Sequence, residues 1–299
     1  MSRRRDQALI GKVFLRGEIV CRTGLHIGAP RDNVEVGGLE APVVRDPLTR
    51  EPYVPGSSLK GKLRALLERR LGLPGNRMVG QEVRRHECLD TACPLCRLFG
   101  AASERGGGDN LPARLLFRDG RLTDTAREGL AGLESGLLYT EWKFENSLDR
   151  VTAASTPRQL ERVPRDAAFA FEIVYSVESR DARELTTDLL HLLESLALLQ
   201  DDYLGGHGSR GSGQVSVTVK EMTGRASGFY GARAPEERAR QEFAAPAASL
   251  DDCFAQVGAV ADFFSGLRAP AAVATPEPAP AAEAPTEPPA DANTEEENP

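Results

Sequence analysis

One histidine and three cysteines are crowded into a short stretch of this 299-residue chain. The stretch HECLDTACPLCRLFG places His86, Cys88, Cys93 and Cys96 in the spacing H-x-C-x4-C-x2-C. Imidazole and thiolate groups at such intervals are typical ligands of a tetrahedral zinc ion. Catalytic zinc keeps one coordination position open, whereas four protein ligands close the site. The spacing therefore predicts a structural zinc clip that staples a loop.

The alternatives are buried thiols beside a chance histidine, or a disulfide. Three of the five cysteines fall in this stretch, which argues against chance. The N-terminal run MSRRRDQALIGKV has no apolar core of a secretory signal, which argues against a disulfide-forming compartment. We therefore expect a cytoplasmic protein in which Cys21 and Cys253 are buried or inert. No run of 18 apolar residues occurs, so we expect no membrane partner.

The acidic charge is concentrated near the C-terminal end. The net charge is −7, from 37 basic and 44 acidic residues. Residues 270–299 are rich in Ala, Pro and Glu and hold seven acidic residues and no basic ones. This composition predicts a disordered tail, and the simplest interpretation is a solvated extension without a specific partner. Residues 1–269 are then neutral, which is compatible with a basic face for nucleic acid.

The alternation of apolar and polar residues predicts an α+β core. The order strand, helix, strand, then strand, helix, strand suggests a ferredoxin-like or RRM-like unit. We expect strands at residues 12–28, 113–123, 168–179 and 213–222, and helices at residues 59–72, capped by Ser57 or Ser58, and 180–200. The core would span residues 1–222, with insertions at about 76–110 and 140–165, and residues 223–269 form an extension whose structure the pattern leaves open.

A glycine-rich loop, DYLGGHGSRGSGQV, joins the second helix to the last strand. Five glycines among residues 205–213 allow the backbone to approach a phosphate closely, and His207, Ser209 and Arg210 add donors. The loop lies between a helix and a strand, unlike a Walker loop, so it does not indicate nucleotide hydrolysis. The alternative is a flexible connection.

Two further segments offer chemistry. The helix start GSSLKGKLR presents free N–H groups and the charge of Lys60 to an anion; the alternative is a solvated basic face. The polar, basic segment at residues 140–164 contains Trp142 and Phe144, which could stack on bases. A long insertion of this kind is usually functional or disordered, and its residue choice argues against disorder.

Five motifs in consistent order, between residues 12 and 222, resemble a known family. They are GLHIG, PVVRDPLTREPYVPGSSLKGKLR, CPLCRLFG, TEWKFENSLDRVTAASTPRQLERVP and DDYLGGHGSRGSGQV. Together they are similar to the repeated backbone subunit of type III-A CRISPR effectors, the Csm complex, which belongs to the RAMP superfamily. The resemblance does not cover residues 223–268 or the acidic tail.

The resemblance implies a ferredoxin-like palm with a protruding thumb and a closed zinc site. It implies that copies of the chain stack along a guide RNA (crRNA), pair it with complementary target RNA and assemble with other subunits of a type III effector. The residues that it implies for RNA contact are His26, Ser58, Lys60, Arg64, Asn146, Arg150, Arg158, Gly206, His207, Ser209 and Arg210.

The position of the catalytic carboxylate departs from the family pattern. Members that cut target RNA place an aspartate twelve residues after GLHIG, and here that residue is Glu40. Glu40 could bind Mg²⁺ or another divalent cation, or orient a 2′-hydroxyl; the alternative is an exposed loop carboxylate. Asp46 of the RDP turn is expected to be structural.

Three functions stay open: a backbone subunit that cleaves target RNA at regular intervals, a non-catalytic scaffold in a type III variant, and a stand-alone RRM-like protein.

Overall fold

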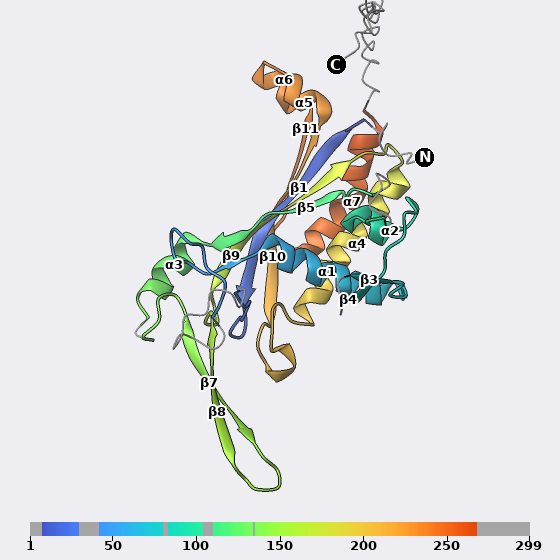
Figure 1. The fold of residues 1–299 in the computed structure, drawn as a ribbon. Coiled ribbons are helices and arrows are strands. Elements are labelled where there is room, and N and C mark those ends of the chain that lie inside the picture. The colour runs from blue at the N-terminus through green and yellow to red at the C-terminus, as the bar shows by residue number, and fades with distance from the viewer. Residues whose placement is uncertain (1–7, 30–41, 80–82, 104–109, 134, 268–299) are drawn as a thin grey trace, which may run out of the picture. The chain divides into compact units, whose positions relative to one another are not determined.

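The computed structural model describes residues 8–29, 42–79, 83–103, 110–133 and 135–267. Its centre is a seven-stranded antiparallel sheet with the order β11-β10-β1-β9-β6-β2, in which β5 also pairs with β9 (Figure 1). The strands are β1 (Gly11–Cys21), β2 (Tyr53–Val54), β5 (Leu115–Phe117), β6 (Gly120–Leu122), β9 (Ala168–Val177), β10 (Val215–Ala226) and β11 (Glu242–Pro246). The predicted tail at residues 270–299 lies outside the described residues.

In the sheet, the two strands of each βαβ unit are separated by one strand of the other unit. Strand β9 lies between β1 and β6, and β1 lies between β9 and β10. Along β1, buried and half-buried residues alternate over the whole strand, because successive side chains point to opposite faces of a sheet. The predicted mixed α and β class is confirmed, and the structure shows that the sheet is antiparallel.

Three long helices gather on one face of the sheet (Figure 1). They are α1 (Gly56–Arg70), α4 (Ala182–Gln200) and α7 (Leu250–Ser265). Leucines at positions 59, 63, 66 and 67 form the buried stripe of α1. None of the described helices is long and apolar enough to cross a lipid bilayer.

The predicted serine cap of α1 is wrong. The helix begins at Gly56, and Pro55 occupies the N-cap position. The side chain of this cap residue makes no hydrogen bond to the helix. Instead, the Asp119 carboxylate accepts a hydrogen bond from the Gly56 N–H at 2.7 Å. A Cβ on Gly56 would lie 2.4 Å from the Phe117 carbonyl oxygen. The close approach to the β5–β6 turn therefore fixes the helix start, through a contact that is remote in sequence.

Residues 223–267, which the sequence pattern left open, add to this core. Strand β10 continues to Ala226, and α5 (Ser227–Gly231) and α6 (Pro235–Ala239) lead to the edge strand β11. Helix α7 then packs against α4 and β10, with Cys253 and Phe264 fully buried.

The two expected insertions are both ordered over their described residues. The first holds the small hairpin of β3 (Arg77–Val79) and β4 (Val83–Arg85), followed by α2 (Pro94–Phe99). Strand β6 continues into α3 (Asp124–Ala131). The second insertion is a hairpin of β7 (Glu141–Leu148) and β8 (Ser155–Arg162), which pair only with each other among the described strands (Figure 1).

Candidate functional site

The four predicted metal ligands converge. One ligand atom from each of His86, Cys88, Cys93 and Cys96 lies within 4.8 Å of the others. The Cys88 and Cys96 sulfurs are 3.6 Å apart, and His86 Nε2 is 3.6 Å from the Cys93 sulfur. Sulfur atoms bound at about 2.3 Å to one tetrahedral zinc ion lie roughly 3.8 Å apart. The cluster can therefore hold a metal ion such as zinc.

The surroundings of the cluster orient its ligands. The Nδ1 atom of His86 lies 3.2 Å from the Pro74 carbonyl oxygen. A carbonyl can only accept, so Nδ1 carries the proton and Nε2 offers its lone pair toward Cys93. Burial raises the pKa of the Cys96 thiol to about 12. A bound cation would compensate for this cost, because thiol ligands bind as thiolates.

Arg64 ties helix α1 to both ends of the cysteine stretch. Its Nη2 donates to the His86 carbonyl at 2.8 Å and its Nη1 donates to the Gly100 carbonyl at 3.0 Å. The residue is buried, with 8% of its surface exposed. If replacement of Arg64 weakens RNA binding, that result alone would therefore not show that Arg64 contacts RNA, because the replacement also loosens the cysteine stretch.

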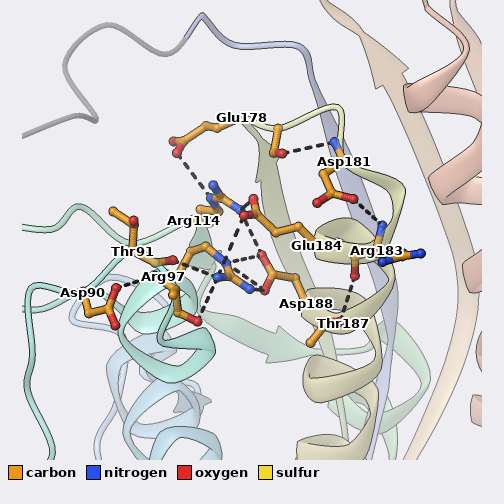
Figure 2. Close-up of polar contacts among 12 residues, drawn as sticks. Asp90, Thr91, Arg97, Arg114, Glu178, Asp181, Arg183, Glu184, Thr187 and Asp188 are labelled. Atoms are coloured by element: carbon orange, nitrogen blue, oxygen red, sulfur yellow. Dashed lines mark hydrogen bonds and ion pairs between the residues drawn. The ribbon is translucent and has the colours of Figure 1, made fainter.

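A buried ion network ties the same stretch to helix α4. Figure 2 shows Arg97 of α2 and Arg114 both directed at the carboxylate of Asp188, at 2.6 and 3.0 Å. The Tyr175 hydroxyl donates to the same carboxylate at 2.8 Å, and Asp188 is fully buried. Arg97 also donates to the Thr91 carbonyl, between two of the cysteines, at 2.8 Å. The cluster of one histidine and three cysteines is thus anchored to the helical layer by charge-assisted hydrogen bonds.

The glycine-rich loop lies directly against the GLHIG segment. The Gly206 N–H donates to the His26 carbonyl at 2.8 Å, and the Gly213 N–H donates to the Gly24 carbonyl at 2.9 Å. Gly205 has a positive φ of 76°, and a Cβ there would lie 2.3 Å from the His26 carbonyl oxygen. Glycine at this position therefore permits the close approach.

Two histidines meet at this contact. The rings of His26 and His207 lie 5.2 Å apart, centroid to centroid. His26 Nδ1 lies 2.7 Å from the Glu161 carbonyl oxygen and donates a hydrogen bond to it, because a carbonyl can only accept. Arg210 donates to Nδ1 of His207. Burial lowers the pKa of His207, and the charges of His26 and Arg210 lower it further.

The base of the β7–β8 hairpin reaches the same loop. Lys143 Nζ donates to the Arg210 carbonyl at 3.4 Å, and Arg210 Nε lies 3.6 Å from the Glu145 carboxylate. Phe144 is 68% exposed on this hairpin. The other residues predicted for this region, Asn146, Arg150 and Arg158, are exposed farther along the hairpin. Their RNA contacts stay predictions.

Helix α1 joins the loop through a residue that sequence reasoning missed. Lys62 Nζ lies 3.0 Å from the Asp202 carboxylate and 3.9 Å from the centre of the Tyr203 ring. Ser58 and Lys60 are half-buried in the first turns of the same helix. The signal that could have found Lys62 is the acidic, aromatic run DDY that precedes the glycines.

Glu161 of β8 is a second residue that sequence reasoning missed. Its carboxylate accepts hydrogen bonds from the Val43 N–H at 2.8 Å, from Arg45 at 2.5 Å and from the Thr140 hydroxyl at 2.6 Å, and the residue is 1% exposed. A lone glutamate among basic residues was the only sequence signal. Glu161 therefore fixes residues 43–45 to the hairpin.

The predicted catalytic residue, Glu40, lies outside the described residues. The described flanks of its segment are held side by side: the Ala29 N–H donates to the Pro42 carbonyl at 2.9 Å, and the Val44 N–H donates to the Ile27 carbonyl at 2.8 Å. The first of these flanks directly follows His26 in the chain. Asp46 accepts hydrogen bonds from two backbone N–H groups of its own turn and pairs with Arg121, which confirms its structural role.

Comparison with known proteins places the chain in a family. The model of the RAMP superfamily matches residues 18–216. The CRISPR system Cms endoribonuclease Csm3 of Methanothermobacter thermautotrophicus is 38% identical over 234 residues, covering 75% of this chain and 90% of that protein. The Csm3 endoribonuclease of Enterococcus italicus is 39% identical over 215 residues, covering 72% and 93%.

A solved structure agrees with this relationship. A chain in the crystal structure of the Csm3–Csm4 subcomplex of the type III-A CRISPR-Cas interference complex superposes with a TM-score of 0.52 at 26% identity. The match covers 84% of this chain and 96% of that chain. The protein therefore belongs to the RAMP superfamily and, within it, to the Csm3 family.

Proposed function

We propose that this chain is a guide-RNA-binding backbone subunit of a type III CRISPR effector complex and that it cleaves target RNA. The observation that carries the proposal is the meeting of GLHIG, the glycine loop and the hairpin base around His26 and His207. The similarity to proteins named endoribonucleases over about 90% of their length supports it. The partners are crRNA, complementary target RNA, further copies of the chain and other effector subunits.

The binding surface suits a ligand of variable sequence. A guide-bound backbone subunit must accept any spacer, so its contacts go mainly to phosphates and sugars. The side chains of Lys60, Ser209 and Arg210 supply such donors. The sheet with its helices acts as the palm. The hairpin acts as the thumb, on which the exposed Phe144 can stack against a base.

Cleavage would proceed by attack of a 2′-hydroxyl on the adjacent phosphate. The thumb splays the duplex at one nucleotide, so that the 2′-oxygen lines up with the leaving 5′-oxygen. Glu40 orients this hydroxyl or holds a divalent cation. Support comes from the described residues on either side of its segment: the backbone of Ala29 pairs with that of Pro42, and Glu161 of the hairpin binds Val43 and Arg45. The His86, Cys88, Cys93 and Cys96 cluster holds structural zinc and takes no part in the reaction.

One observation favours the alternative of a non-catalytic scaffold. Glutamate stands at position 40, where family members that cut carry aspartate. The glutamate side chain is longer than that of aspartate by one methylene, so its carboxylate lies farther from the backbone. A misplacement of about 1 Å can cost roughly a hundredfold in rate. The scaffold would retain every RNA contact described above.

Replacement of Lys60 by alanine tests the binding surface. We expect weaker binding to single-stranded RNA, with a salt dependence of log affinity that is shallower by about 0.7 for one lost phosphate contact. Fluorescence anisotropy over a salt series measures both quantities. Lys220→Ala is the control, because Lys220 pairs with Glu18 on β1, away from the glycine loop. An unchanged affinity and slope, or a strong preference of the wild type for one RNA sequence, would contradict the proposal.

A further inference from the structure

Three arginines surround one buried carboxylate where the β3–β4 hairpin meets helix α1. Glu87 Oε1 lies 2.5 Å from Arg85 Nη2 and 3.8 Å from Arg64 Nη2, and Glu87 Oε2 lies 2.7 Å from Arg77 Nη1. The side chain of Glu87 is only 2% exposed. Glu68 of α1 also acts on Arg64, and two carboxylates cannot neutralise three guanidinium groups, so this cluster carries excess positive charge.

The hydrogen bonds of the cluster are also incomplete. The Nε–H groups of Arg64 and Arg85 are buried and have no hydrogen-bond partner among the described residues. Arg64 as a whole is 8% exposed. A buried donor without an acceptor is unfavourable, and more so on a charged group. The cluster therefore has both the charge and the donors to accept an anion.

Lys60 belongs to the same cluster. It lies one helical turn before Arg64 on α1 and is half-buried. Burial lowers the pKa of Lys60, and the charges of Arg64 and Arg85 lower it further. These three cations are thus close enough to repel one another, which an anion between them would relieve.

We propose that Lys60 and Arg85 hold one phosphodiester of single-stranded RNA between them, with the buried Arg64 supplying positive charge from behind. Arg85, from the loop that carries the metal ligands, would then add an RNA contact to the surface of α1. The proposal rests on the proposed guide-RNA function. Guanidinium groups suit this role because their forked N–H donors match phosphate oxygens.

The competing explanation is that the arginines balance the charge of the metal centre. Three thiolates and one imidazole on Zn²⁺ carry a net charge of −1, and Cys96 is among the groups that favour the charged form of Arg64. In that case Arg85 would matter for metal retention and not for RNA. The two explanations predict different responses to one substitution.

The test compares Arg85→Gln with Arg84→Gln in the full chain. Arg84 is the exposed neighbour on the same strand, and its side chain points to the opposite face. Binding to a single-stranded RNA of random sequence is measured over a salt series. We expect Arg85→Gln to make the slope of log affinity against log salt shallower by about 0.7. When the salt concentration rises tenfold, the affinity of this variant should therefore fall by a factor about five times smaller than the factor for the wild type. Arg84→Gln should change the slope less, and Arg85→Lys should restore it.

Elemental analysis and thermal unfolding of the same samples complete the test. Arg85→Gln should retain the metal content of the wild type. An affinity and slope equal to those of the wild type, or a slope change that Arg84→Gln matches, would overturn the phosphate site. Reduced metal content with an unchanged slope would assign the arginines to the metal centre. A wild-type chain that fails to bind RNA would refute the proposed function itself, before any variant is compared.

Discussion

Replacement of Glu40 by alanine is expected to abolish the cutting of target RNA and to leave RNA binding intact. A carboxylate that acts on the 2′-hydroxyl contributes at the transition state rather than to ground-state binding. Loss of a positioned acid or base typically slows a reaction by about 10²- to 10⁴-fold. The measurement is single-turnover cleavage of a matched target RNA by the guide-loaded complex, with and without a divalent cation, together with the affinity for the same RNA.

Two further variants sharpen this experiment. Glu40→Asp restores the residue of the cutting relatives and should match or exceed the wild-type rate if the family geometry is kept. Asp46→Asn is the control: Asp46 is a nearby carboxylate engaged in its own turn and with Arg121, so cutting should persist. If Glu40→Ala cuts as fast as the wild type, Glu40 is not catalytic. If neither the wild type nor Glu40→Asp cuts, the scaffold alternative holds.

Replacement of Cys93 by serine is expected to release the bound zinc and to lower the thermal midpoint of unfolding. The apparent free energy of structural zinc binding in small zinc-dependent domains is about 10–16 kcal/mol at pH 7, so one lost thiolate removes a large local stabilisation. The effect should spread beyond the loop, because Arg64 and Arg97 join the cysteine stretch to helices α1 and α4. Elemental analysis of the purified chain and thermal unfolding measure the two effects.

Cys253→Ser is the matched control for this variant. Cys253 is a fully buried cysteine, whereas Cys93 is partly buried, and Cys253 lies in α7 among apolar residues. Its replacement should cost stability and leave one zinc ion per chain. A chelator should lower the thermal midpoint of the wild type and of Cys253→Ser, and should not change that of Cys93→Ser. A wild-type chain that contains no zinc and responds to no chelator would contradict the metal site.

Features encoded by neighbouring residues could be predicted from the sequence. The His86 to Cys96 cluster could be found because its ligands share one short stretch, and the structure brings them within 4.8 Å. Strands β1 and β9 and helix α4 followed from their periodicity, since alternation and leucine spacing are local signals. The meeting of the glycine loop with GLHIG was not predicted, because the two segments lie far apart in the chain.

Features that depend on partners far apart in the chain could not be predicted. Asp188 appears in the sequence as one acidic residue of an amphipathic helix, yet it lies buried between Arg97 and Arg114, about 75 to 90 positions away. Glu161 likewise gains its role only when β8 meets residues 43–45. The cap of α1 was missed for the same reason, because Asp119 supplies the hydrogen bond from another element.

The most direct test of the proposed function is a map of the cleavage sites on target RNA. The chain is assembled with guide RNA and the other effector subunits, and the ends of the cut products are sequenced for several unrelated guides. A repeated backbone subunit predicts cuts at one constant interval, set by distance along the guide and unchanged when the spacer sequence changes. Cuts that follow a target sequence, or a single isolated cut, would contradict the account.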